Sequence, residues 1–132
     1  MDVFRINGRA YNVNVLDLEE TFNILYSENT TRNIGVGAPL VLDPLGTFFG
    51  HLITVSAKKG YEDEYDELYD FLTKPRRKGV PVYIVHGQDY IQYEAYVSQG
   101  RKKLKRLDEK TEKRYWGELN INIIPTKAQV LP

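Results

Sequence analysis

Apolar side chains recur at every second position through most of this chain, which is the spacing of β-strands. In residues 16–26, the alternation of Phe22, Ile24 and Tyr26 favours one long strand, although the acidic residues before them could instead begin a helical turn. The same alternation predicts further strands at residues 3–6, 11–15, 47–56, 80–86, 90–98 and 115–124.

Two short turns join predicted neighbours into hairpins. The dipeptide Asn7-Gly8 suits a type I′ turn, because both central residues of that turn adopt positive φ. We therefore expect residues 3–6 to pair with residues 11–15. A turn at residues 87–89 predicts a second hairpin, between residues 80–86 and 90–98.

One segment has the period of a helix. Between residues 61 and 74 the apolar positions fall on a single helical face, formed by Tyr61, Tyr65, Leu68, Tyr69 and Leu72. Acidic residues fill the rest of the surface, and Pro75 disfavours continuation of the helix. Because such a face needs an apolar surface to cover, the sequence predicts a mainly β (α+β) fold. One amphipathic helix, at about residues 61–74, packs on the sheet.

Two long polar segments interrupt the strands. Residues 27–46 contain repeated Gly and Pro, which predicts a long loop, and loops of this length inside a domain usually carry function. Residues 100–114 hold eight of the eighteen Lys and Arg residues and have no clear apolar face. We expect this basic segment to form either an extended hairpin arm or a mobile loop.

Composition narrows the class of protein. The chain of 132 residues is most simply one domain, 1–132, and its 18 basic residues balance its 18 acidic residues. No global charge therefore attracts nucleic acid. The sequence has no cysteine, and no run of eighteen apolar residues, so we predict no thiolate chemistry and no membrane segment.

Residues suited to catalysis are scarce. The two histidines, His51 and His86, each lie inside a predicted strand, and packed or surface roles fit them better than metal binding. Carboxylate pairs such as Glu62 and Asp66 lie on a solvated helix face, where nothing separates their pKa values. We expect no catalytic residue, no cofactor and no metal site, and therefore no enzyme.

The basic segment leaves three interpretations open. It could meet the acidic helix face of another copy of the chain, remain a solvated loop, or bind nucleic acid through phosphates. Acidic residues interrupt it, and no aromatic residue lies between Arg101 and Arg114 to stack on bases. Self-assembly and a solvated loop are the stronger interpretations.

Several strings of the sequence together resemble small proteins of tailed bacteriophages and prophages of Gram-positive bacteria. They are FRINGRAYNV at residues 4–13, ENTTRN at 28–33, DPLGTFFGHLITV at 43–55, EYDELYDFLTKP at 64–75, YEAYVS at 93–98 and WGELNINIIP at 116–125. The order of strands with one helix also resembles the tail-tube fold, shared by tail tube proteins and the N-terminal domain of distal tail proteins.

The resemblance implies a tail-tube-like β-sandwich or barrel that assembles as a hexameric ring around the DNA channel of the virion tail, after synthesis in the cytoplasm of the host bacterium. Its neighbours would be tail tube, tape-measure and hub or baseplate proteins. A head-to-tail joining or tail-terminator protein is the alternative within the same particle, and a small nucleic-acid-binding module is the alternative outside it.

The expected subunit interface combines the long loop, the acidic helix face and the basic segment. Its residues are Arg32, Asn33, Asp66, Glu67, Asp70, Arg101, Lys102, Lys103, Lys105 and Arg106.

Overall fold

The fold is known from a computed structural model, which describes residues 2–28, 30–32 and 40–132. Its described elements are β1 (Phe4–Ile6), β2 (Val13–Tyr26), β3 (Thr31–Arg32), β4 (Leu40–Val41), β5 (Pro44–Ala57), α1 (Glu62–Leu72), β6 (Val80–His86), β7 (Asp89–Leu107) and β8 (Arg114–Pro125). Six strands form one antiparallel sheet in the order β1-β6-β7-β8-β5-β2, and β3 pairs with β4. The predicted mainly β class with one helix is confirmed.

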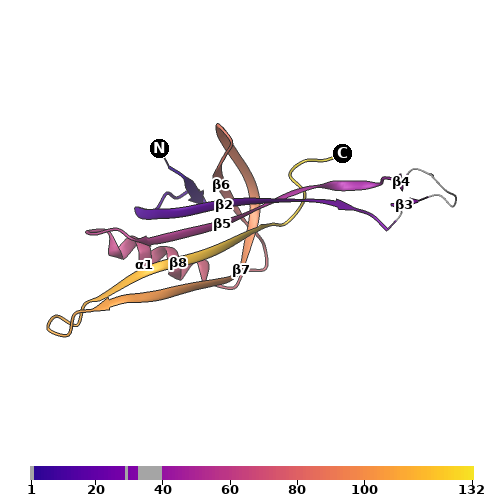
Figure 1. Ribbon diagram of the computed structural model, residues 1–132. Coiled ribbons are helices and arrows are strands. Elements are labelled where there is room, and N and C mark those ends of the chain that lie inside the picture. Colours follow the sequence, from indigo (N-terminus) through magenta and orange to yellow (C-terminus); the bar gives the residue numbers. More distant parts are fainter. Residues whose placement is uncertain (1, 29, 33–39) are drawn as a thin grey trace.

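The sheet bends at β7, its longest strand. The first part of β7 pairs with β6 up to Ala95, whereas its second part pairs with β8 alone among the described strands. A register shift between Val97 and Gly100 marks the change, as expected where a bulge bends a strand. In Figure 1, β6 and the start of β7 cross the direction of β2, β5 and β8. The bent sheet therefore folds over a core.

The core lies between the two parts of the sheet and α1. Its buried side chains come from β1, β5, β6, β7, β8 and the helix, and they include Phe4, Ile6, Ile53, Val55, Tyr65, Leu68, Val82, Ile84, Leu119, Ile121 and Ile123. These positions alternate along their strands, so the period of two in the sequence identifies the inward face.

The helix lies where the periodicity predicts it, and it is slightly shorter than the predicted range. Tyr65 and Leu68 are fully buried, Tyr69 and Leu72 are partly buried, and Tyr61 is exposed at the N-cap. The hydroxyl of Tyr65 donates to the carbonyl of Gly117 at 3.3 Å. Burial, followed by the charge of neighbouring groups, raises the pKa of Tyr65 to about 12. The aromatic face thus fixes the helix to β8.

The first predicted hairpin is wrong in its pairing. Asn7 and Gly8 do adopt positive φ, at 53° and 79°. Beyond the single bridge from Ile6 to Arg9, however, β1 pairs with β6 and β2 pairs with β5. Both apolar side chains of β1 are buried, so this strand takes the neighbour that completes the core.

The predicted loop at residues 27–46 is partly regular. It includes β3 and β4, and β5 begins at Pro44 instead of residue 47. Residues 29 and 33–39 of the predicted loop lie outside the described residues. The basic segment forms an extended hairpin arm, the first of its two predicted alternatives.

Two arms extend from the sheet in opposite directions in Figure 1. We call residues 22–26 of β2 with 44–49 of β5 the apolar arm. We call residues 100–107 of β7 with 108–117 the basic arm.

Candidate assembly surfaces

The apolar arm exposes large side chains that a monomer would normally bury. Phe22, which pairs with Phe49, is 67% exposed, and Ile24, Leu25 and Tyr26 are also exposed. Among the described strands, β2 pairs with β5 alone, so its outer edge is unpaired over 14 residues. A long, apolar strand edge is a site at which another chain can add.

Hydrogen bonds at both strands hold the backbone of the apolar arm in place, although its large side chains are exposed. The Ser27 amide donates to the Asp43 carbonyl at 2.9 Å, and the Asp43 amide donates to Thr30 Oγ1 at 3.0 Å. On the other side of β5, the side chain of Gln129 exchanges two hydrogen bonds with the backbone of Phe49, at 3.0 and 2.8 Å. These contacts present the exposed side chains on a defined strand pair.

The basic arm divides the predicted cations into two groups. Lys102 turns inward, with Nζ 3.8 Å from the ring centre of Tyr69 and 4.1 Å from that of Trp116. Arg106 lies 4.4 Å from the ring centre of Tyr115. The other three predicted cations, Arg101, Lys103 and Lys105, are exposed and form no ion pair with any residue of the described part of the chain.

The carboxylates of the acidic helix face also fall into two groups, those that pair within the chain and those that do not. Glu67 pairs with Arg9 of the same chain, whereas Asp66 and Asp70 are exposed and have no ion pair among the described residues. At the start of the helix, Glu62 lies 3.5 Å from Lys113 of the basic arm. The basic arm therefore runs beside the helix of its own chain. Of the three helix carboxylates expected at the interface, those of Asp66 and Asp70 can still meet a neighbour, and exposed Asp63 of the same helix can also do so.

Two residues of the expected interface come from the long predicted loop. Arg32 lies in β3, where its backbone pairs with Leu40. Asn33 lies outside the described residues, so the structure does not place it.

A polar cluster around the buried His51, consisting of Glu20, His51, Tyr93 and His86, joins four strands of the sheet. His51 is 1% exposed, with Nε2 2.9 Å from Glu20 Oε1 and Nδ1 2.6 Å from the Tyr93 hydroxyl. Because an ionised carboxylate only accepts, Nε2–H donates to Glu20, and in neutral His51 Nδ1 accepts from Tyr93. Nδ1 of His86 donates to the same Glu20 oxygen.

Proton affinities in this cluster favour neutral His51 beside ionised Glu20. Burial lowers the pKa of His51, against the opposing effect of Glu20. Burial alone would raise the pKa of Glu20, but hydrogen bonds from His86 and His51 outweigh it, so the pKa of Glu20 lies below its ordinary value. Burial chiefly raises the pKa of Tyr93. The cluster connects β2, at one end of the sheet, to β6 near the other end.

In the described structure, this cluster brings both histidines to one carboxylate and so links β2, β5, β6 and β7 by side-chain hydrogen bonds. Within residues 2–28, 30–32 and 40–132, no group of three or more His, Asp or Glu side chains is placed to hold a metal ion. No helix of this described part is long and apolar enough to cross a membrane.

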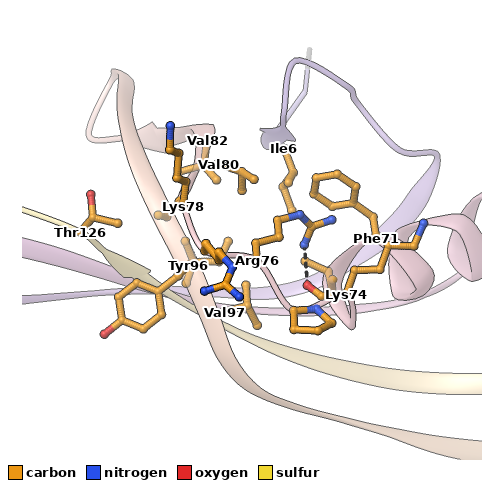
Figure 2. A pocket seen from close by; sticks show the side chains of 16 residues that line it. Ile6, Phe71, Lys74, Arg76, Lys78, Val80, Val82, Tyr96, Val97 and Thr126 are labelled. Carbon is orange, nitrogen blue, oxygen red and sulfur yellow. Dashed lines mark hydrogen bonds between the residues drawn. The ribbon is translucent and has the colours of Figure 1, made fainter.

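A cleft of about 380 Å³ opens where β6 begins and its pairing with β7 ends at Ala95. Figure 2 shows its apolar side chains, among them Ile6, Val80 and Val97, together with the basic residues that follow α1. The basic residues at 74 and 76–78 can be read from the sequence, but nothing in the sequence indicates a cavity beside them. Clefts of this size are within the range of binding pockets.

Comparison with known proteins adds no family. No protein-family model matches this chain, and searches of curated proteins and of solved structures return no match.

Proposed function

We propose that this protein is a structural component of a bacteriophage tail, a short distal-tail, baseplate or tail-tube-like subunit that assembles as a ring around the DNA channel. The observation that carries the proposal is the apolar arm, whose exposed Phe22 and unpaired strand edge suit a permanent neighbour. The parts of the proposal that name a phage tail and a ring depend on the resemblance of the sequence to small tail proteins.

The charges of β2 and of the basic arm favour contact between different surfaces of successive copies. The first half of β2 carries exposed Asp17 and Glu19, and the basic arm carries Arg101, Lys103 and Lys105. Two copies that paired β2 with β2 about a twofold axis would bring like charges together, which destabilises a sheet. Pairing of β2 with the basic arm brings opposite charges together, and head-to-tail contacts of this kind close into rings.

The neighbours of such a ring would be tail tube, tape-measure and hub or baseplate proteins, with DNA passing through the channel. A head-to-tail joining or tail-terminator protein would use the same self-assembly, so its place in the particle distinguishes the two. Locating the subunit in a map of the purified particle decides between them.

A nucleic-acid-binding module is the second candidate, and the exposed cations of the projecting basic arm favour it. Three phosphate contacts through Arg101, Lys103 and Lys105 would give DNA binding that weakens steeply with salt. If the triple variant with Gln at these positions binds DNA as the wild type does, this candidate fails.

Sedimentation of the purified protein over a range of concentrations tests the proposed self-assembly. We expect an oligomer that the change Phe22→Ser weakens about tenfold or more, because exposed aromatic anchors dominate many interfaces. Tyr61→Ser is the matched control, since Tyr61 is exposed at the far end of α1 and should not affect assembly. A wild-type protein that stays monomeric and is absent from virions would contradict the proposal.

A further inference from the structure

Two features of this chain are complementary and occur on different parts of the molecule. The first is the exposed apolar run Phe22–Tyr26, which lies between two exposed carboxylates, Glu19 and Glu28. The second is the cleft beside α1, which is apolar inside and basic at its mouth. The cleft could bury the apolar side chains of the run, and the basic residues at its mouth could pair with the two carboxylates.

The interior of the cleft is part of the core. Ile6, Val82, Ala95 and Ile123 line it and are almost fully buried from solvent, so the cleft reaches the inner face of the sheet. Its position explains why it is open. Beyond Ala95, β7 no longer pairs with β6, and the chain from α1 to Val80 crosses this gap without a strand to fill it.

The mouth of the cleft is basic. Lys74, Arg76, Arg77 and Lys78 follow the helix in succession and are all exposed. Figure 2 shows Arg76 beside Phe71, where its guanidinium lies 3.9 Å from the ring centre and donates to the Lys74 carbonyl at 3.0 Å. No ion pair joins these four cations to another residue of the described chain. An occupant with an apolar centre and flanking carboxylates is therefore favoured.

We infer that the cleft of one copy receives the apolar run Phe22–Tyr26 of a second copy, with Phe22 and Ile24 entering the cleft. This inference rests on the proposed self-assembly and names the surface that receives the apolar arm. Val80 and Val97 pack against the core but are only partly buried, so burial of Phe22 and Ile24 against them would remove further apolar surface from water.

The flanking charges agree with one direction of docking. From Val97 in the cleft, β7 leads in one direction to Arg101 on the basic arm. In the other direction Ala95 pairs with Val80, which closely follows Arg77 and Lys78. The spacing of charge and apolar residue is similar on the two strands: Glu19 and Phe22 are three positions apart on β2, and Val97 and Arg101 are four apart on β7. A second copy running antiparallel to β7 would place Glu19 near Arg101 and Glu28 near Arg77 and Lys78.

A cysteine pair tests the contact directly, because the natural sequence has no cysteine. In the full-length variant Ile24→Cys with Lys78→Cys, mild oxidation should produce disulfide-linked dimers and larger species on a non-reducing gel. The control pair Ile24→Cys with Lys59→Cys uses a lysine that is also exposed but lies beyond the other end of α1, an 11-residue helix about 16 Å long, and should give far less linkage. Equal linkage in both variants, or none in the first, overturns the inference.

Charge reversal supplies a second test that does not depend on disulfide geometry. Arg77→Glu with Lys78→Glu should weaken self-association about tenfold or more, and Glu28→Lys in the same chain should restore part of it. Lys110→Glu, on the tip of the basic arm, is the control. Circular dichroism of each variant confirms that it folds.

The outcomes separate this inference from the proposed function. A wild-type protein that is monomeric throughout contradicts both. If the protein forms an oligomer whose stability the charge reversal does not change, and the cysteine pair gives no specific linkage, only the docking in the cleft is contradicted. Saturable binding of dodecanoate that Ala95→Leu abolishes, without an effect of the charge reversal on assembly, would instead show that the cleft takes a small amphipathic anion.

Discussion

The imidazole Nε2 of His51 lies 2.9 Å from Glu20 Oε1, at the point where the core ends and the apolar arm begins. Residues 53 and 55 on one side of this contact are buried, and residues 22 and 24 on the other side are exposed. The contact therefore holds the base of the arm against the body of the sheet.

This contact predicts that the protein loses stability as the pH falls. The folded state lowers the pKa of His51 below 6.5, so below that pH the unfolded chain binds a proton that the folded chain does not. The contribution of neutral His51 to the free energy of unfolding is therefore fully present above about pH 6.5 and is lost as the pH falls. Glu20, whose pKa is also lowered, adds a loss of the same sign below about pH 4.5. One such proton changes the free energy of unfolding by at most about 1.4 kcal/mol per pH unit.

Urea denaturation between pH 7.5 and 5 measures this dependence. The variant His51→Gln should show a smaller loss of stability over that range than the wild type, because its side chain cannot titrate. His86→Gln is the control, since His86 is partly exposed. If the free energy of unfolding changed equally with pH in the wild type and in His51→Gln, the contact between His51 and Glu20 would not control the pH dependence.

The helix should contribute strongly to the stability of the single chain. Leu68 is fully buried between α1 and the sheet, so Leu68→Ala should lower the free energy of unfolding by about 2–5 kcal/mol. Leu72→Ala, at a partly buried position of the same helix, should cost less. Thermal or urea denaturation of the two variants would contradict the packing if the order were reversed.

The sequence predicts the local features of this fold well and the distant pairings poorly. The helix and the Asn7-Gly8 turn depend on neighbouring residues, and both occur where their patterns indicate. The pairing of β1 with β6 joins Phe4 to Ile84, and nothing near Phe4 in the sequence specifies that partner. Such a pairing is chosen by the core as a whole.

The apolar arm shows a similar limit for the candidate site. Alternation in the sequence shows that Phe22 and Ile24 share a face of β2, but it cannot show whether another element covers that face. The structure shows that they are exposed, whereas the charged residues chosen from the sequence include Glu67 and Lys102, which contact their own chain. Asp66 and Asp70 stay available to a neighbour.

Reversal of Asp66 and Asp70, the two expected interface carboxylates that form no ion pair within the described chain, therefore tests the acidic face. Asp66→Lys with Asp70→Lys should weaken self-association several-fold and leave the fold intact, because neither side chain forms an ion pair within the described chain. Sedimentation at low and high salt measures the effect, which should shrink as salt screens the charges. Unchanged association at low salt would exclude this face from the interface.

Gly46, which pairs with Leu25 near the outer end of the apolar arm, should be sensitive to a single added methyl group. Gly46 has φ of 145°, and a Cβ there would lie 2.7 Å from Ala128 Cβ and 2.8 Å from the Val130 carbonyl oxygen. Gly46→Ala should displace residues 128–130 and speed hydrogen exchange of the Thr47 amide, which donates to Val130 at 2.8 Å. Gly60→Ala is the control, because Gly60 also has positive φ but a Cβ added there would meet no atom within 4 Å. Slow exchange of Thr47 in Gly46→Ala would contradict the close contact.

Native mass spectrometry combined with electron microscopy of the purified full-length protein tests the central claim most directly. We expect closed rings of one defined subunit number with a central channel, and their loss in Phe22→Ser. A monomer at every concentration, with no rings in the images, would contradict the proposed assembly.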